Sequence, residues 1–134
     1  ATGLRKLNED IVVPRGRLVD LMRFTAGLQK RCGFPIACFG HAGDGNIHTN
    51  IMVGDWENPR VRERAAKALD ELFARVLAWG GAITGEHGIG IAKLPWWQAA
   101  TTPASRSVHA AIKSALDPNF LLNPGKFVTP EKHR

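Results

Sequence analysis

The chain has 134 residues, 44% of them hydrophobic, with a formal net charge of +6 and a pI near 9.9. These values are typical of one globular domain, and no apolar run is long enough to span a bilayer. Two cysteines are too few for a disulfide framework. The basic residues are dispersed, without the interleaved basic and aromatic pattern of a nucleic-acid module, so we expect no nucleic-acid partner.

The first part of the chain predicts strands and a helix. Residues 10–13 form a short apolar run that predicts a strand. Pro14 suits the first turn of a following helix, whose apolar spacing continues up to Gly33. Two apolar runs, 34–39 and 47–53, predict the two strands of a hairpin.

A second helix and a short strand are predicted next. Asn58-Pro59 is typical of a helix start, and the residues after it have the clearest helical periodicity in the chain. Gly80-Gly81 ends this helix, and residues 82–84 predict another strand. The order β-α-β-β-α-β predicts an α+β fold of the ferredoxin-like type, with an antiparallel sheet and both helices on one face.

The remainder of the chain predicts a helical tail. Residues 93–100 predict a short helix or loop, and Pro103 opens a further helix that Asp117-Pro118-Asn119 ends. Residues 121–127 have neither helical nor strand periodicity and predict a loop.

The hairpin carries the strongest functional signal. Asp44-Gly45 is the dipeptide of a two-residue type I′ turn, which would place His41 opposite His48. Directly opposed residues hold their Cβ atoms roughly 5 Å apart, which suits two imidazoles that bind one metal ion. Glu86-His87, between glycines, offers a third ligand and an acid/base group. Three protein ligands with an open position are typical of a catalytic metal site, although the histidines alone could also be a packed polar pair.

Four separated motifs resemble one family. HAGDGNIH, ITGEHGIG and LDPNFLLNPGK, together with EDIVVPRGRL near the start, are similar to the C-terminal domain of the FAD-linked 2-hydroxy acid dehydrogenases. That family includes the glycolate oxidase catalytic subunit, D-lactate dehydrogenase and D-2-hydroxyglutarate dehydrogenase. The resemblance implies that residues 1–134 are the last part of a substrate (cap) domain. It also implies that an N-terminal FAD-binding domain, absent from this chain, is a partner, and that the chain alone is inactive.

The resemblance also assigns roles to site residues. It implies that His41, His48 and Glu86 bind a divalent ion, with zinc expected and iron or manganese left open. His87 would be the general base, and Asn50 would lie near the substrate, a small D-2-hydroxy acid such as glycolate or D-lactate.

Two further pairs of residues extend the site. Arg5 and Lys6 would contact the substrate carboxylate, with exposed charges near the terminus as the alternative. Asn123 and Lys126 lie in the segment that, in the family, reaches back to the flavin domain, and so would contact the FAD side.

Two other functions stay open on the residues alone. A metal-dependent hydrolase would use the same ligands with a metal-bound water. A ferredoxin-like binding module would perform no chemistry, and the hairpin and the GEHGIG segment would be only turns. No signal peptide is recognisable at the start, so we expect a cytoplasmic protein, with attachment to the inner membrane through partner oxidase subunits as the alternative.

Overall fold

The computed structural model describes residues 3–126 and 128. The chain divides into two compact units, Ala1–His87 and Gly88–Arg134. Each unit is described by itself below. No helix in the described part of the chain combines the length and the apolar character needed to cross a membrane.

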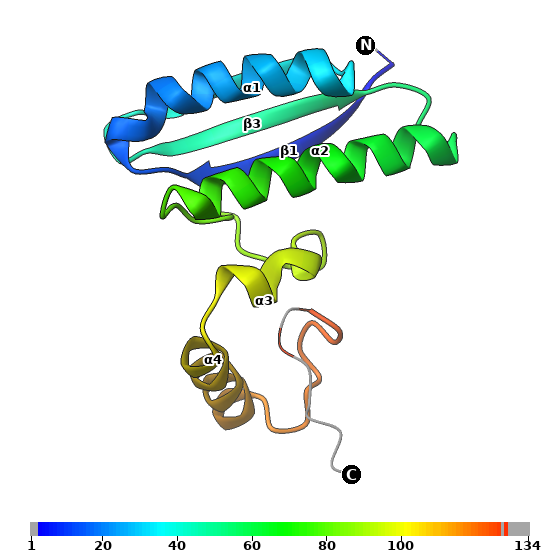
Figure 1. Cartoon of the computed structure of the whole chain (residues 1–134). Helices are drawn as coiled ribbons and strands as arrows, with labels where there is room; N and C mark the ends of the chain where they lie inside the picture. Colours follow the sequence, from blue (N-terminus) through cyan, green and yellow to red (C-terminus); the bar gives the residue numbers. More distant parts are fainter. Residues whose placement is uncertain (1–2, 127, 129–134) are drawn as a thin grey trace. The chain divides into compact units, whose positions relative to one another are not determined.

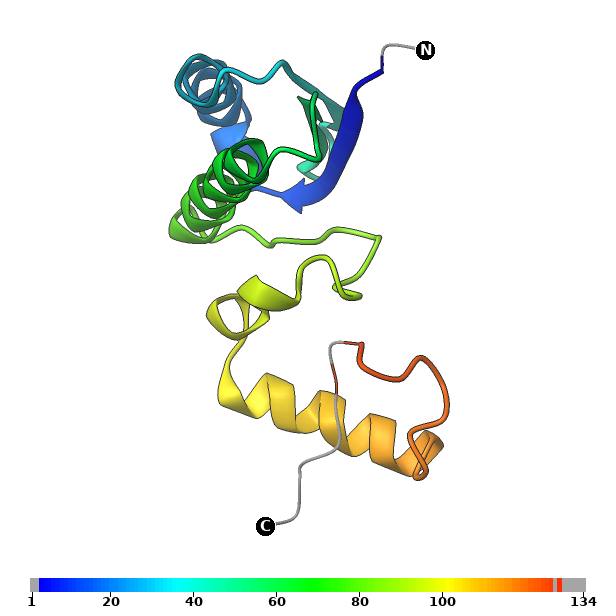
Figure 2. The same cartoon turned by 90° about the vertical axis from the view of Figure 1, so that its right-hand side faces the viewer.

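The first unit is a small antiparallel sheet covered on one face by helices (Figures 1 and 2). Its strands β1 (Arg5–Val12), β2 (Ile36–His41) and β3 (Asn46–Val53) are ordered β1-β3-β2. A 3-10 turn η1 (Arg15–Arg17) leads into α1 (Leu18–Cys32), and α2 (Pro59–Ala78) follows β3. The α+β class, the antiparallel sheet and the helices on one face agree with the prediction.

The sheet has two different faces because successive side chains of a strand point in opposite directions. The face toward the helices carries the core of β3, in which Ile51 and Val53 are fully buried. The opposite face of β3 carries Asn46, His48 and Asn50. The β1 residue paired with His48 is Asp10, so Asp10 shares that second face. The sheet therefore separates an apolar face from a face with polar and ligand-forming groups.

The predicted helix signals act as expected in α2. The Asn58 side chain accepts the N–H of Arg60 at 3.0 Å, and Pro59 occupies the first helical position. The helix buries one stripe of its surface against the sheet, and this stripe consists of Ala65, Ala68, Leu72, Phe73 and Val76. The periodicity of the sequence therefore located both the helix and its buried face.

The fourth predicted strand is not formed. Residues 82–84 contribute a single antiparallel bridge, between Ala82 and Val12 at the outer edge of β1. Beyond Ala82 the chain meets β1 once more, through the N–H of Gly85 and the backbone carbonyl of Asp10 at 3.0 Å, and the N–H groups of residues 85–87 donate to the side chain of Asp10. The complete ferredoxin-like order is therefore not established, and the sheet of the described residues has three strands.

The hairpin between β2 and β3 also differs from the prediction. A type I′ turn needs positive φ at both Asp44 and Gly45, but only Gly45 has it, at +80°. The loop spans residues 42–45, and the N–H groups of Asp44 and Gly45 donate to the carbonyl of His41 at 3.3 and 3.0 Å. His41 therefore pairs with Asn46, and the predicted direct pairing of His41 with His48 is wrong.

The physical reason lies outside the hairpin. Val13 donates its N–H to the carbonyl of Gly45 at 3.0 Å. A Cβ added to Gly45 would lie 2.1 Å from the carbonyl oxygen of Val13. This close backbone contact comes from a segment far earlier in the sequence, so a rule based on the turn dipeptide alone cannot include it.

The second unit is helical, as predicted. It contains a 3-10 turn η2 (Leu94–Trp96), a single turn α3 (Trp97–Ala100) and the longer α4 (Pro103–Leu116). Thr102 caps α4 by accepting the N–H of Ser105 at 3.1 Å. The segment 121–126 forms no helix or strand, in agreement with the prediction, and Phe127 lies outside the described residues.

Candidate metal centre

Three potential metal ligands meet on the face of the sheet that is opposite the helices and carries Asp10 and His48, called the open face below. His41 ends β2, His48 lies in the middle of β3, and Glu86 belongs to the loop after Ala82. One ligand atom from each lies within 4.8 Å of the other two. His48 Nε2 is 3.4 Å from Glu86 Oε1. The three residues that the sequence selected as ligands are thus close together in the structure.

The observed register still permits this meeting. His41 pairs with Asn46, which is two positions from His48, so both histidines project from the same face as diagonal neighbours. Their ring centroids are 6.1 Å apart and their planes are almost perpendicular, at 75°. Diagonal residues are farther apart at Cβ than opposed ones, but imidazole side chains are long enough to bridge this distance.

His87, the predicted general base, lies beside this group. Its Nε2 is 3.8 Å from Glu86 Oε1, and its ring stacks on that of His48 with centroids 5.4 Å apart. Its other nitrogen, Nδ1, is 3.8 Å from Asp10 Oδ1. The imidazole is half-exposed, so one edge is open to an incoming molecule while the other is directed at a buried carboxylate.

Asp10 is a site residue that the sequence analysis missed. Its side chain is fully buried, and Oδ2 accepts the N–H groups of Gly85, Glu86 and His87 at 2.9, 2.6 and 2.8 Å. The hydroxyl of Thr84 donates to the same carboxylate at 3.2 Å. The buried acidic residue within a predicted strand was a usable signal, because a buried charge needs partners.

Two asparagines of β3 also face the site. Asn46 and Asn50 alternate with His48 on the open face and are 8% and 4% exposed. The side-chain oxygen of each is buried without a hydrogen-bond partner among the described residues. Buried polar atoms are normally paired, so these two unpaired oxygens are exceptions on this face of the sheet. Asn50 was predicted near the substrate, whereas Asn46 was not predicted.

The structure separates the two predicted cations near the start of β1. Arg5 pairs with Val53, on the helix-covered face, and its guanidinium lies 4.4 Å from the ring centroid of Trp56. Lys6 pairs with Met52 and therefore shares the open face with His48. Of the two, only Lys6 projects from the face that carries the candidate ligands.

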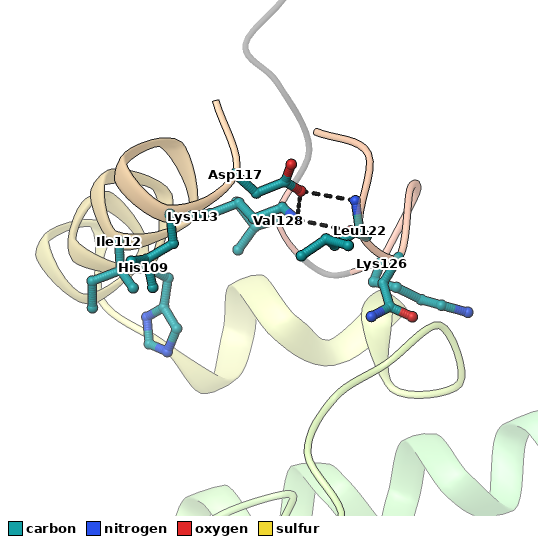
Figure 3. Close-up of a pocket in the computed structure, with 9 residues that line it drawn as sticks. His109, Ile112, Lys113, Asp117, Leu122, Lys126 and Val128 are labelled. Atoms are coloured by element: carbon teal, nitrogen blue, oxygen red, sulfur yellow. Dashed lines mark hydrogen bonds and ion pairs between the residues drawn. The ribbon is translucent and has the colours of Figure 1, made fainter. Parts of the chain in front are cut away.

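Asn123 and Lys126 belong to the second unit, where they line a groove of about 340 Å³ between α4 and the segment that follows it (Figure 3). Ile112 and Leu116 give this groove an apolar side, and both are more than half exposed. Asn123 has a positive φ of 49°, and Lys126 donates its N–H to the Asn123 carbonyl at 3.3 Å. The two predicted FAD-side residues are thus close to each other.

The donor set on the sheet fits a divalent transition metal. Two imidazoles and one carboxylate are ligands that zinc, iron and manganese accept, and three protein ligands leave a position for a substrate or water. Within the described residues, no other group of His, Cys, Asp and Glu side chains has this arrangement.

Comparisons with known proteins agree on one family. The family of FAD linked oxidases, C-terminal domain, matches residues 2–127. The chain is 35% identical over 117 residues to a D-lactate dehydrogenase of Anaerostipes hadrus, covering 87% of this chain and 25% of that protein. It is 34% identical over 126 residues to the glycolate oxidase subunit GlcD of Bacillus subtilis, covering 94% of this chain and 27% of that protein.

A solved structure supports the fold. The 4-ethylphenol oxidase from Gulosibacter chungangensis, in complex with isoeugenol, matches 99% of this chain and 26% of its own with a TM-score of 0.70 and 21% identity. The chain spans about a quarter of the length of the curated relatives described above. Because the family match covers nearly the whole chain, this protein belongs to the FAD-linked oxidases, as their C-terminal domain.

Proposed function

We propose that this chain holds the substrate and a divalent metal ion in an FAD-linked dehydrogenase that oxidises a small D-2-hydroxy acid to the 2-oxo acid. The observation that carries the proposal is the convergence of His41, His48 and Glu86, with ligand atoms within 4.8 Å of one another. The names of the relatives support the substrate class, because lactate and glycolate are both 2-hydroxy acids.

The residues around the ligands have separate tasks in this proposal. When bound, the divalent ion would supply Lewis-acid chemistry that lowers the pKa of a substrate hydroxyl. His87 accepts the hydroxyl proton at Nε2, the nitrogen nearer Glu86, while Nδ1 is directed toward Asp10. The flavin of the FAD-linked oxidases would supply the redox chemistry.

Polar groups of the open sheet face would orient the substrate. In this proposal, the side-chain oxygens of Asn46 and Asn50, which lack a hydrogen-bond partner among the described residues, would accept hydrogen bonds from it. Lys6, on the same face, would contact its carboxylate, whereas Arg5 is engaged with the ring of Trp56. The groove with Asn123 and Lys126 would contact the FAD-binding part of the enzyme, in keeping with the family.

The test uses the enzyme expressed from the complete reading frame that contains this chain. We expect His48→Ala to lose the metal and to lower turnover of D-lactate or glycolate more than about 100-fold, since removing even an outer partner of a metal ligand costs about 10–100-fold. The flavin absorbance should stay unchanged. Metal content by mass spectrometry and steady-state kinetics are the measurements.

A matched pair of carboxylate variants provides the control. Glu86→Gln should behave like His48→Ala, whereas Glu63→Gln, on the exposed surface of α2, should keep both metal and turnover. Full metal content in His48→Ala would show that the ligand assignment is wrong. A loaded enzyme that oxidises neither D-lactate nor glycolate would contradict the substrate class.

A further inference from the structure

The loop that carries Glu86 and His87 is held by one side chain. Three successive backbone N–H groups, those of Gly85, Glu86 and His87, converge on Oδ2 of Asp10 at 2.9, 2.6 and 2.8 Å. Gly85 also donates to the backbone carbonyl of Asp10 at 3.0 Å. This loop contributes no strand to the sheet. The hydrogen bonds to Asp10 therefore hold it in place, as ladder hydrogen bonds hold the strands.

The physical chemistry of Asp10 makes this attachment strong. A buried carboxylate is costly unless hydrogen bonds satisfy it, and Asp10 is 0% exposed. Hydrogen bonds from N–H groups to an ionised carboxylate are roughly twice as strong as bonds between neutral groups. Successive N–H groups that converge on one anion also form a recurrent and specific geometry in proteins. The loop and the carboxylate therefore stabilise each other.

The position of Asp10 relates it to several members of the site at once. On β1 it is the direct pairing partner of His48, and its Oδ1 lies 3.8 Å from His87 Nδ1. Its Oδ2 accepts the N–H of Glu86, a proposed ligand, and of His87, the proposed base. The side chain of Asp10 thus links three site residues: a proposed ligand on the sheet, a proposed ligand on the loop and the proposed base.

Close packing leaves the loop little freedom on its other side. A Cβ added to Gly85 would lie 2.6 Å from the side chain of Asn46. The loop backbone is thus pressed against β3 while Asp10 holds its N–H groups from β1. A shift of the loop would move Glu86 away from His48, to which its carboxylate is 3.4 Å distant.

We propose that Asp10 is a positioning residue, which fixes Glu86 and His87 relative to the sheet histidines through the N–H groups of residues 85–87. The benefit of this positioning to metal binding rests on the proposed function. The attachment of the loop to Asp10 does not, because it can be tested on this chain without a metal. Outer partners of metal ligands typically contribute 10–100-fold to metal affinity. Asp10 would do so through the backbone of the loop.

The test compares Asp10→Asn with the unchanged 134-residue chain. Asparagine keeps the size of the side chain but removes the charge and replaces one oxygen with an NH₂ group, which opposes incoming donors. We expect Zn²⁺ affinity to fall by about 10–100-fold by calorimetry. We also expect amide hydrogen exchange of residues 85–87 to accelerate in the metal-free chain. Asp20→Asn, at a partly exposed position of α1, makes the same charge change and should alter neither quantity.

The outcomes separate this inference from the metal proposal. A folded Asp10→Asn chain with unchanged exchange at residues 85–87 would overturn the inference. If the unchanged chain binds no Zn²⁺, the metal proposal fails, and accelerated loop exchange in Asp10→Asn still supports Asp10 as the residue that holds the loop. If Asp10→Asn does not fold, exchange in the unchanged metal-free chain decides. Protection of residues 85–87 above that of residues 42–43 supports the inference, and equal exchange overturns it.

Discussion

At the scale of single residues, Gly45 is a position where only glycine fits. Its φ is +80°, and an added Cβ would lie 2.1 Å from the Val13 carbonyl oxygen. We expect Gly45→Ala to lower the free energy of unfolding by at least about 1–2 kcal/mol, because a left-handed conformation costs that much for an L-residue before the contact with Val13 is counted. Urea denaturation followed by circular dichroism measures the change.

Gly43 is the matched control in the same loop. It has no positive φ, and a Cβ added there meets nothing within 4 Å. Gly43→Ala should therefore change the free energy of unfolding by less than about 0.5 kcal/mol. Equal effects of the two substitutions would mean that the backbone of the loop does not approach Val13 as described.

The residue types selected the candidate ligands, but they did not predict the contacts between them. His41, His48 and Glu86 were identified from a motif, and the structure brings them together although the register of the hairpin differs. An acidic residue within a predicted strand indicates that Asp10 needs partners, but which partners was not predictable, because they lie 75 to 77 positions later. No local pattern connects a strand residue to a loop so far along the chain.

At the scale of elements, α4 ends in a polar cluster that fixes the chain after it. The carboxylate of Asp117 is paired with the Lys113 ammonium and accepts the N–H of Leu122 at 2.9 Å (Figure 3). It also accepts the N–H of Leu121 at 3.0 Å. The Lys113 ammonium, followed by these two N–H groups, holds the pKa of Asp117 below its ordinary value of 3.8, against the opposing effect of burial.

The sign of this pKa shift predicts a pH dependence. A carboxyl group whose pKa is lowered by folding stabilises the folded state above the ordinary pKa and loses this effect as the pH falls through the lowered value. At neutral pH, Asp117→Asn should therefore reduce the amide-exchange protection of Leu121 and Leu122. The difference from the unchanged chain should disappear in acid well below pH 3.8. NMR exchange, corrected for intrinsic rates, measures both.

Glu63 provides the comparison for this cluster. It also forms an ion pair with a lysine four positions later, Lys67, which lowers its pKa, but both side chains are largely exposed. Exposed pairs of this kind contribute little, so Glu63→Gln should leave the protection at Leu121 and Leu122 unchanged at every pH. A pH-independent effect of Asp117→Asn would show that its charge is not what holds the segment.

The elements differ in how well the sequence predicted them, and the reason is the range of the contacts that form them. The helices α2 and α4 were predicted from caps, prolines and periodicity, all of which are local. Residues 82–84, the fourth predicted strand, form only the bridge between Ala82 and Val12, and the N–H groups of residues 85–87 after them converge on the side chain of Asp10. A strand forms only where another strand pairs with it. Here three successive N–H groups instead find their partner in a side chain of β1, which no local sequence pattern predicts.

At the scale of the whole molecule, the apolar core is unevenly divided between the two units. Among the described residues, the buried hydrophobic side chains lie between Ile11 and Ile83, except for Ile89 in the second unit. The candidate ligands, together with Asp10 and His87, all belong to the first unit. That unit therefore contains both the main core and the complete candidate metal centre.

This division predicts different behaviour of the two pieces when they are produced separately. We expect residues 1–87 to unfold cooperatively on heating and to bind Zn²⁺ as tightly as the 134-residue chain, since every proposed ligand is present. We expect residues 88–134 to show no cooperative transition, because an isolated helix of the length of α4 is marginal in water without packing. Thermal circular dichroism and calorimetric Zn²⁺ titration of both fragments provide the measurements.

Cooperative unfolding of residues 88–134, or non-cooperative unfolding of residues 1–87, would show that the core is not divided as the burial indicates. Weaker Zn²⁺ binding by a folded 1–87 fragment would mean instead that the metal centre draws a ligand from the second unit.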